Sequence, residues 1–163
     1  MTSMQDFRAL DVDRWEEEAL SAADLAVHDP RSAQELLQIA KGKQAGVRTK
    51  LASNDTPGAL AQVLDDPPYG DHADQAKQIN FSLLVEILNA TRSTEIANVV
   101  KSLSLTHRDT LMSYLYKGLA MAGTRSQSTP TVNCAVFLLW HERLTQAAGT
   151  GCIMRVMTDR RSL

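Results

Sequence analysis

The pattern nearest to a catalytic motif is the pair His141-Glu142, which could begin the His-Glu-x-x-His motif of zinc-dependent hydrolases. That motif needs a second histidine four residues after the first, because only this spacing puts both imidazoles on one helix face around a tetrahedral ion. Thr145 stands at that position, so no zinc site is predicted. We interpret His141 as a partly buried side chain that is hydrogen-bonded at the surface of a helical bundle.

The remaining histidines and the two cysteines offer no better set of ligands. His28, His72 and His107 lie in or beside predicted loops, with no cysteine near them in the sequence. Cys134 and Cys152 both lie within apolar runs, where burial raises the pKa of a thiol and makes it unreactive. We therefore predict two buried free thiols, which are typical of a protein in a reducing compartment.

Two further patterns also have ordinary structural explanations. Gly149-Thr150-Gly151 precedes a predicted helix but lacks the lysine of a phosphate loop, so we interpret it as a helix end followed by a hinge. Asp65 and Asp66 are adjacent in a predicted turn, where two carboxylates are usually solvated. The sequence thus predicts that the protein is not an enzyme and binds no cofactor, metal ion or small-molecule ligand.

The composition favours helices as the elements that position these residues. The chain has 163 residues, the length of one ordinary domain, and 44% of them are hydrophobic. Aromatic residues are only 5%, whereas β-sheet proteins usually contain more of them. No secretory signal is predicted, and no apolar run approaches the roughly 18 residues of a membrane span. We expect a soluble intracellular protein.

Charge separates the chain into two parts. The first 30 residues hold eight acidic residues and two basic ones, a net charge of -6, and the remaining residues carry +4. An acidic segment on a mildly basic body indicates that the two parts meet different surfaces. No dense basic stripe is present, so binding to nucleic acid is not expected. We divide the chain into an extended acidic N-terminal arm, residues 1–30, and a helical core domain, residues 31–163.

The arm has two interpretations. It could be a solvated and partly disordered terminus, ended by Asp29-Pro30. Alternatively, it could be an extended segment whose Phe7, Val12 and Trp15 insert into a partner. Disordered segments usually contain few large aromatic residues, which favours the second interpretation.

Apolar residues at helical spacing predict an all-α fold, an irregular bundle of about six or seven short helices. The predicted helices cover residues 32–51, 56–64, 73–90, 96–103, 106–122, 132–148 and 151–160. A break is expected near residues 42–46, where two glycines occur. The predicted N-terminal caps are Thr56, Ser93 or Thr94, and a capping box at Thr106.

The last two helices carry more specific expectations. Residues 132–140 are apolar on nearly every side, so this helix is predicted to be the central helix of the bundle, begun by Thr129-Pro130. The final helix is expected to bury Ile153, Val156 and Met157.

Several sequence stretches resemble the signature segments of the actin-related protein 2/3 complex subunit 5 family. They lie in the same order along nearly the whole chain: 7–13, 59–68, 111–119, 138–143 and 147–158. Residues 14–45 show no clear counterpart, and the loop at 123–133 is longer than usual, so only local contacts there depart from the family.

The resemblance implies a cytoplasmic structural subunit of a complex that nucleates branched actin filaments. It implies that the helical body docks on subunit 4 and subunit 1, and that the arm tethers actin-related protein 2, with actin as an indirect partner. A free-standing helical adaptor that binds short peptides in a groove is the alternative.

Within this interpretation, ten residues are candidate partner contacts. In the arm they are Phe7, Arg8, Val12, Asp13 and Trp15.

In the body, Tyr114, Tyr116 and Trp140 fit the core of the bundle and an interface equally well. Lys117 and Arg155 are candidates for the rim of an interface, with solvated surface as the alternative.

Overall fold

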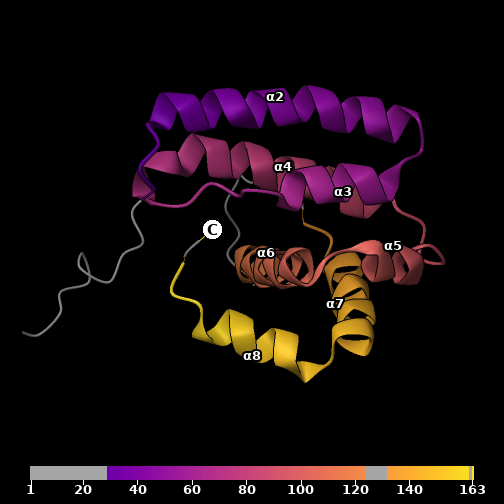
Figure 1. Cartoon of the computed structure of the whole chain (residues 1–163). Helices are drawn as coiled ribbons and strands as arrows, with labels where there is room; N and C mark the ends of the chain where they lie inside the picture. Colours follow the sequence, from indigo (N-terminus) through magenta and orange to yellow (C-terminus); the bar gives the residue numbers. More distant parts are fainter. Residues whose placement is uncertain (1–28, 124–131, 162) are drawn as a thin grey trace, which may run out of the picture.

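A computed structural model describes residues 29–123, 132–161 and 163 of the chain. These residues form helices and no strand, so the predicted all-α class is confirmed (Figure 1). The helices are α2 (Ala33–Ala52), α3 (Thr56–Leu64), the short 3₁₀ helix η3 (Asp71–Ala73), α4 (Asp74–Ala90), α5 (Ile96–Ser102), α6 (Leu105–Gly123), α7 (Cys134–Ala148) and α8 (Thr150–Thr158).

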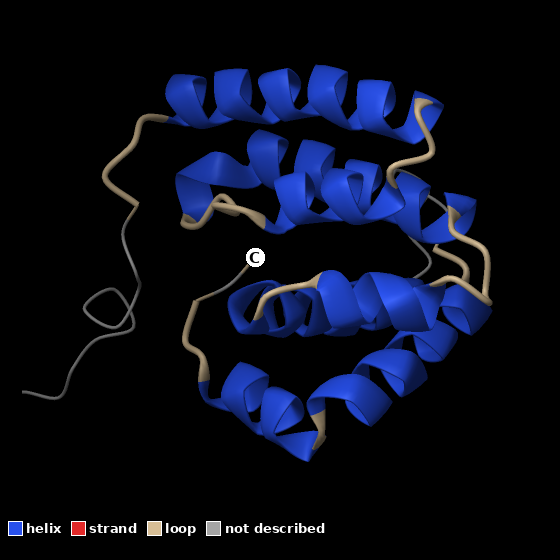
Figure 2. Ribbon diagram, turned by 45° about the vertical axis from the view of Figure 1, so that its right-hand side comes forward, coloured by secondary structure: helices blue, strands red, loops and turns tan. Residues whose placement is uncertain are grey.

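The helices form two groups, which Figures 1 and 2 show from two directions. Helices α2, α3 and α4 pack on one another in the upper group, and α6, α7 and α8 do so in the lower group. The groups are joined by contacts of α4 with α7 and of α3 with α5 and α6. Helix α2 therefore lies at the opposite side of the molecule from α8.

Helix α2 is continuous, so the predicted break at 42–46 is wrong. A glycine inside a helix costs about 1 kcal/mol relative to alanine, which is small beside the burial of one large apolar side chain. Leu36, Ala40 and Val47 are buried along α2, and they hold its two halves on one line. Tertiary packing thus overrides the weak helix propensity of Gly42 and Gly46.

Two predicted helix starts are displaced by one or two residues. The cap of α3 is Asp55 rather than Thr56, and its carboxylate accepts a hydrogen bond from the main-chain N–H of Gly58 at 3.0 Å. At α6 the hydroxyl of Ser104 accepts from the main-chain N–H of His107 at 3.2 Å, so the capping box predicted at Thr106 is not formed.

Helix α5 begins after Glu95 without a side-chain cap, so the predicted caps Ser93 and Thr94 are also wrong. At α7, Asn133 accepts from the main-chain N–H of Ala135 at 3.1 Å and begins the helix at Cys134. The predicted start at residues 129–130 lies outside the described residues.

Helix α4 is far more buried than α7, which was predicted to be the central helix of the bundle. Most of α4 is buried, because it contacts α2 and α3 on one side and α7 on another. In α7 only Phe137, Trp140 and Leu144 are buried, whereas Leu138 is 56% exposed. An apolar sequence shows that a helix can be covered on all sides, but not that this chain alone covers it.

None of the described helices is both long and apolar enough to cross a membrane.

Candidate partner-binding surfaces

The predicted arm contacts Phe7, Arg8, Val12, Asp13 and Trp15 lie outside the described residues. The described part of the chain begins at Asp29.

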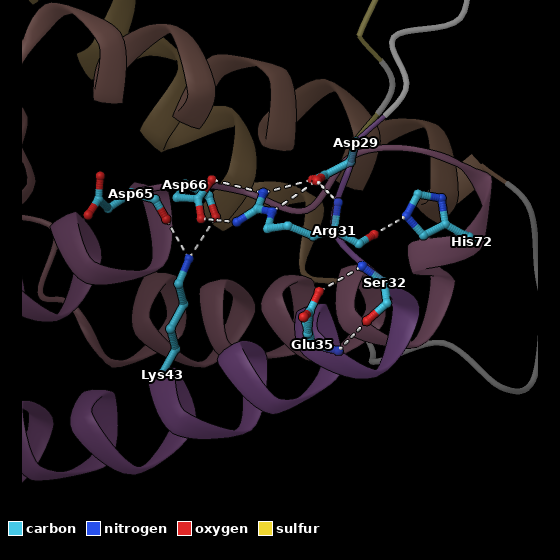
Figure 3. A network of polar contacts seen from close by, with 8 residues as sticks. All are labelled: Asp29, Arg31, Ser32, Glu35, Lys43, Asp65, Asp66 and His72. Atoms are coloured by element: carbon cyan, nitrogen blue, oxygen red, sulfur yellow. Dashed lines mark hydrogen bonds and ion pairs between the residues drawn. The ribbon is translucent and has the colours of Figure 1, made fainter.

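The residues that precede α2 are held by a polar cluster that we call the clasp: Asp29, Arg31, Asp66 and His72 (Figure 3). The guanidinium of Arg31 donates to Asp29 from Nε at 2.9 Å and from Nη2 at 2.7 Å. The same group donates to Asp66, in the loop after α3, from both terminal nitrogens. Nε2 of His72 donates to the main-chain oxygen of Arg31 at 3.0 Å. The clasp therefore joins residues 29–31 to residues 66–72 at two points.

The electrostatics of the clasp favour its charged form. Hydrogen bonds from Arg31 lower the pKa of Asp29 to about 2, although burial opposes this shift. The bonds to Asp29 and Asp66 raise the pKa of Arg31. The Asp29 side chain is only 5% exposed, and that of Arg31 is 30% exposed. Such partial burial protects the pair from the solvent screening that makes fully exposed ion pairs weak.

Lys43 of α2 supports the same loop from the other side. Its ammonium group donates to the main-chain oxygens of Asp65 and Asp66, the second at 2.9 Å. Asp66 has a positive φ of 45°, and its carbonyl is turned toward α2. The expectation that Asp65 and Asp66 are simply solvated is thus wrong for Asp66, whose carboxylate is paired with Arg31.

At the opposite side of the molecule, α8 presents apolar side chains to solvent. Met154 and Met157 are 63% and 69% exposed and lie one turn apart, on the same face of the helix. The predicted burial of Met157 is therefore wrong. Cys152 is buried, and Ile153 and Val156 are partly buried against the core.

Arg155, a predicted rim residue, lies between these methionines and forms an ion pair with Asp109 of α6. Its Nε and Nη2 donate to the two carboxylate oxygens at 2.7 and 2.8 Å. Through this ion pair, Asp109 joins α6 to α8.

A second exposed apolar pair lies on α7. Cys134 and Leu138 are four residues apart, on one helix face, and both are exposed. The prediction that Cys134 is buried is wrong. Cys152 is buried as predicted, and this burial, together with the nearby Asp109, raises the pKa of its thiol to about 12.

An open groove of about 560 Å³ lies between the loop after α3, helix α6 and helix α8. The C-terminal segment lines part of it, with the guanidinium of Arg161 5.1 Å from the ring centre of Tyr69. The groove walls mix both signs of charge, and within the described residues no group of three potential ligands could hold a metal ion.

The aromatic candidates in the body fall into two classes. Tyr114 and Trp140 are 1% and 0% exposed, so both belong to the core of this chain. The indole N–H of Trp140 points to the main-chain oxygen of Leu88 at 3.4 Å. Tyr116 is partly exposed, and its hydroxyl lies 3.2 Å from Nε2 of His141, as the interpretation of this histidine required.

Lys117 reaches the end of the chain, where its ammonium group donates to the main-chain oxygen of Leu163 at 2.6 Å.

Comparison with known proteins decides the family. The model of the ARP2/3 complex 16 kDa subunit family (p16-Arc) matches residues 6–163. The chain belongs to this family. A p16-Arc relative from Saccharomyces cerevisiae, actin-related protein 2/3 complex subunit 5, is 34% identical over 160 residues, which cover 97% of this chain and 98% of the relative.

Two further relatives come from animals. A probable actin-related protein 2/3 complex subunit 5 from Caenorhabditis elegans is 35% identical over 72% of this chain and 76% of its own length. A human actin-related protein 2/3 complex subunit 5-like protein is 29% identical over 96% of this chain and 94% of its own length. The resemblance stated from the signature segments is confirmed.

The sequence did not reveal the clasp of this p16-Arc member. Arg31 and Asp66 are 35 residues apart, and no local pattern indicates that they meet. The available signals were two short acidic segments rich in proline, Asp29-Pro30 and Asp65-Asp66-Pro67-Pro68, which mark turns without showing their proximity.

Proposed function

We propose that this chain is a non-catalytic structural subunit of the ARP2/3 complex, in which its body docks on neighbouring subunits and its arm tethers actin-related protein 2. Membership of the p16-Arc family supports the assembly. The complex nucleates branched actin filaments, so the site of action is the cytoplasmic actin cytoskeleton.

The observation that carries this proposal is the apolar surface on α7 and α8. Contiguous exposed apolar patches on a soluble protein mark sites where it meets a partner. Leu138, Met154 and Met157 are all more than half exposed. Methionine is also enriched at protein interfaces, where its flexible side chain adapts to the partner. We assign this surface to docking on subunits 4 and 1.

The arm acts through local concentration. A body fixed on one subunit holds the attached arm at roughly millimolar concentration near a second subunit, so that weak contacts suffice. Phe7, Val12 and Trp15 are spaced along an acidic segment and supply apolar anchors, while Arg8 and Asp13 supply charge. A buried aromatic anchor contributes about 2 kcal/mol or more when measured by truncation.

The docking surface is tested by co-expression with the other subunits and affinity capture. The double substitution Met154→Asp and Met157→Asp is expected to release the chain, because it buries two charges in the interface. Ile39→Asp is the matched control, since Ile39 is also exposed but lies on α2, at the opposite side of the molecule (Figure 1). Equal capture of the double variant and the wild type would refute docking through α8, and a monodisperse chain that captures no subunit would favour the peptide-binding adaptor.

The tether is tested by deleting residues 1–28, which leaves Asp29 and the clasp in place. The shortened chain is expected to remain in the assembly while actin-related protein 2 is lost during extended washing. Normal retention of actin-related protein 2 would count against the tether.

A further inference from the structure

The clasp holds residues that precede the first described helix. Helix α2 already has a complete capping box: Ser32 accepts from the main-chain N–H of Glu35 at 3.3 Å, and Glu35 accepts from that of Ser32 at 2.9 Å. The main-chain N–H groups of Ser32 and Glu35 at the start of α2 therefore have hydrogen-bond partners without Asp29 or Arg31. The clasp instead fixes two residues outside the helix, where the arm begins.

The geometry of the clasp restricts direction as well as position. Arg31 uses the fork of its guanidinium to bind carboxylates from two chain segments at once (Figure 3). Two-pronged contacts of this kind fix orientation, which a lysine could not do. The bond from His72 to the main chain of Arg31 adds a third constraint on the backbone itself.

We propose that the clasp is a positioning device, which sets the place and direction in which the N-terminal arm leaves the body. This inference rests on the proposed tether. Arg31 and Asp66 are positioning residues, because they act on the partner only through the arm.

The expected size of the effect follows from the length of the arm. Release of residues 29–32 lengthens a 28-residue arm by four residues, which lowers its local concentration by a factor of only about 1.2. Loss of a fixed direction lets the arm explore the half of space that faces away from the partner, a further factor of about two. Together they predict a roughly two- to three-fold faster release of the arm's partner.

The perturbing variant is Arg31→Met, which removes the guanidinium and keeps an apolar stem. Arg48→Met is the matched control, because Arg48 is an exposed arginine on α2 that takes no part in the clasp. Asp66→Asn is a milder second variant, since asparagine tolerates the positive φ at this position.

Two measurements report the position of the arm relative to the body and the strength of the tether. Spin labels on the native exposed Cys134 and on Val27→Cys report the distance between body and arm root in the full-length chain. The rate at which actin-related protein 2 leaves the assembled complex reports the tether. Thermal unfolding of each variant shows whether the fold is retained.

The proposal predicts a narrow distance distribution for the wild type and for Arg48→Met. It predicts a broad distribution and a two- to three-fold faster release for Arg31→Met, with intermediate values for Asp66→Asn. An unchanged distribution, or a release rate within 1.2-fold of the control, would overturn it. Deletion of residues 1–28 separates the two hypotheses: if it leaves release unchanged, the tether itself fails, whereas the distance distribution still decides whether the clasp orients the chain.

Discussion

Gly118 lies where α6 packs on α7, and its replacement by alanine tests how closely these helices approach. A Cβ atom at this position would meet the ring of Phe137, nearest to Cε1 and within 2.8 Å of Cδ1 and 2.9 Å of Cζ. Phe137 is fully buried, so its ring has no free space into which it can turn. Helix α7 carries part of the candidate docking surface, and α6 packs against both α7 and α8.

The magnitude follows from two opposing terms. Alanine in place of glycine favours a helix by about 1 kcal/mol. Overpacking of a closed core costs about 1–3 kcal/mol, and three short contacts with one ring place this site at the upper end. We therefore expect Gly118→Ala to lower the free energy of unfolding by about 2 kcal/mol, which corresponds to a fall in Tm of roughly 4–8 °C.

The matched control is Gly42→Ala in α2. A Cβ atom there would have no neighbour within 4 Å, so only helix propensity acts. This variant is expected to be more stable than the wild type by about 0.5–1 kcal/mol. Urea unfolding of the full-length chain, followed by far-ultraviolet circular dichroism, measures both. A Gly118→Ala variant as stable as the wild type, or shifts of the same sign in both variants, would refute the close approach of α6 to α7.

Two further predictions concern ionisable groups. Asp29 has a pKa lowered to about 2 by Arg31, so its charge contributes stability above the pKa of the unfolded chain, near 4, and this contribution is lost as the pH falls from about 4 to 2. The difference in stability between the wild type and Asp29→Asn should therefore shrink over that range, and a constant difference in urea titrations would contradict the ion pair. A thiol reagent at neutral pH should modify Cys134 quickly, whereas Cys152, buried and with its pKa raised to about 12, should react only after urea is added. Equal labelling of the two cysteines in the folded chain, measured by mass spectrometry of peptides, would show that one of these placements is wrong.

The order and type of the helices could be predicted because each has a regular apolar face. The helix predicted at 73–90 is observed as α4 (Asp74–Ala90), since its apolar residues recur at helical spacing and loops with proline or glycine precede it. The first residue of each helix was harder to predict from the sequence. Asp55 and Ser104 are capping residues of the expected types, but neighbouring threonines are equally suitable, and only the backbone geometry selects between them.

Burial could not be predicted where it depends on what surrounds a helix. The apolar sequence of α7 predicts a helix that is covered on all sides, yet Leu138 is 56% exposed. Met157 lies at a spacing that suits either a core or an interface, and the structure places it on the surface. Both errors fall on the surface that we propose as the docking site for other subunits.

Ion pairs between residues far apart in the chain could not be predicted from the sequence, for a different reason. Charged residues occur throughout the chain, and an ion pair such as Arg31 with Asp66 or Arg155 with Asp109 depends on the packing of whole helices. Neither pair belongs to a local motif.

The most direct test of the account is affinity purification of the full-length chain from its native cell, with the co-purifying proteins identified and quantified by mass spectrometry. The account predicts that the other subunits of the ARP2/3 complex, actin-related protein 2 among them, are recovered in equal amounts with the chain. Recovery of the chain alone, as a monodisperse protein without these subunits, would contradict it.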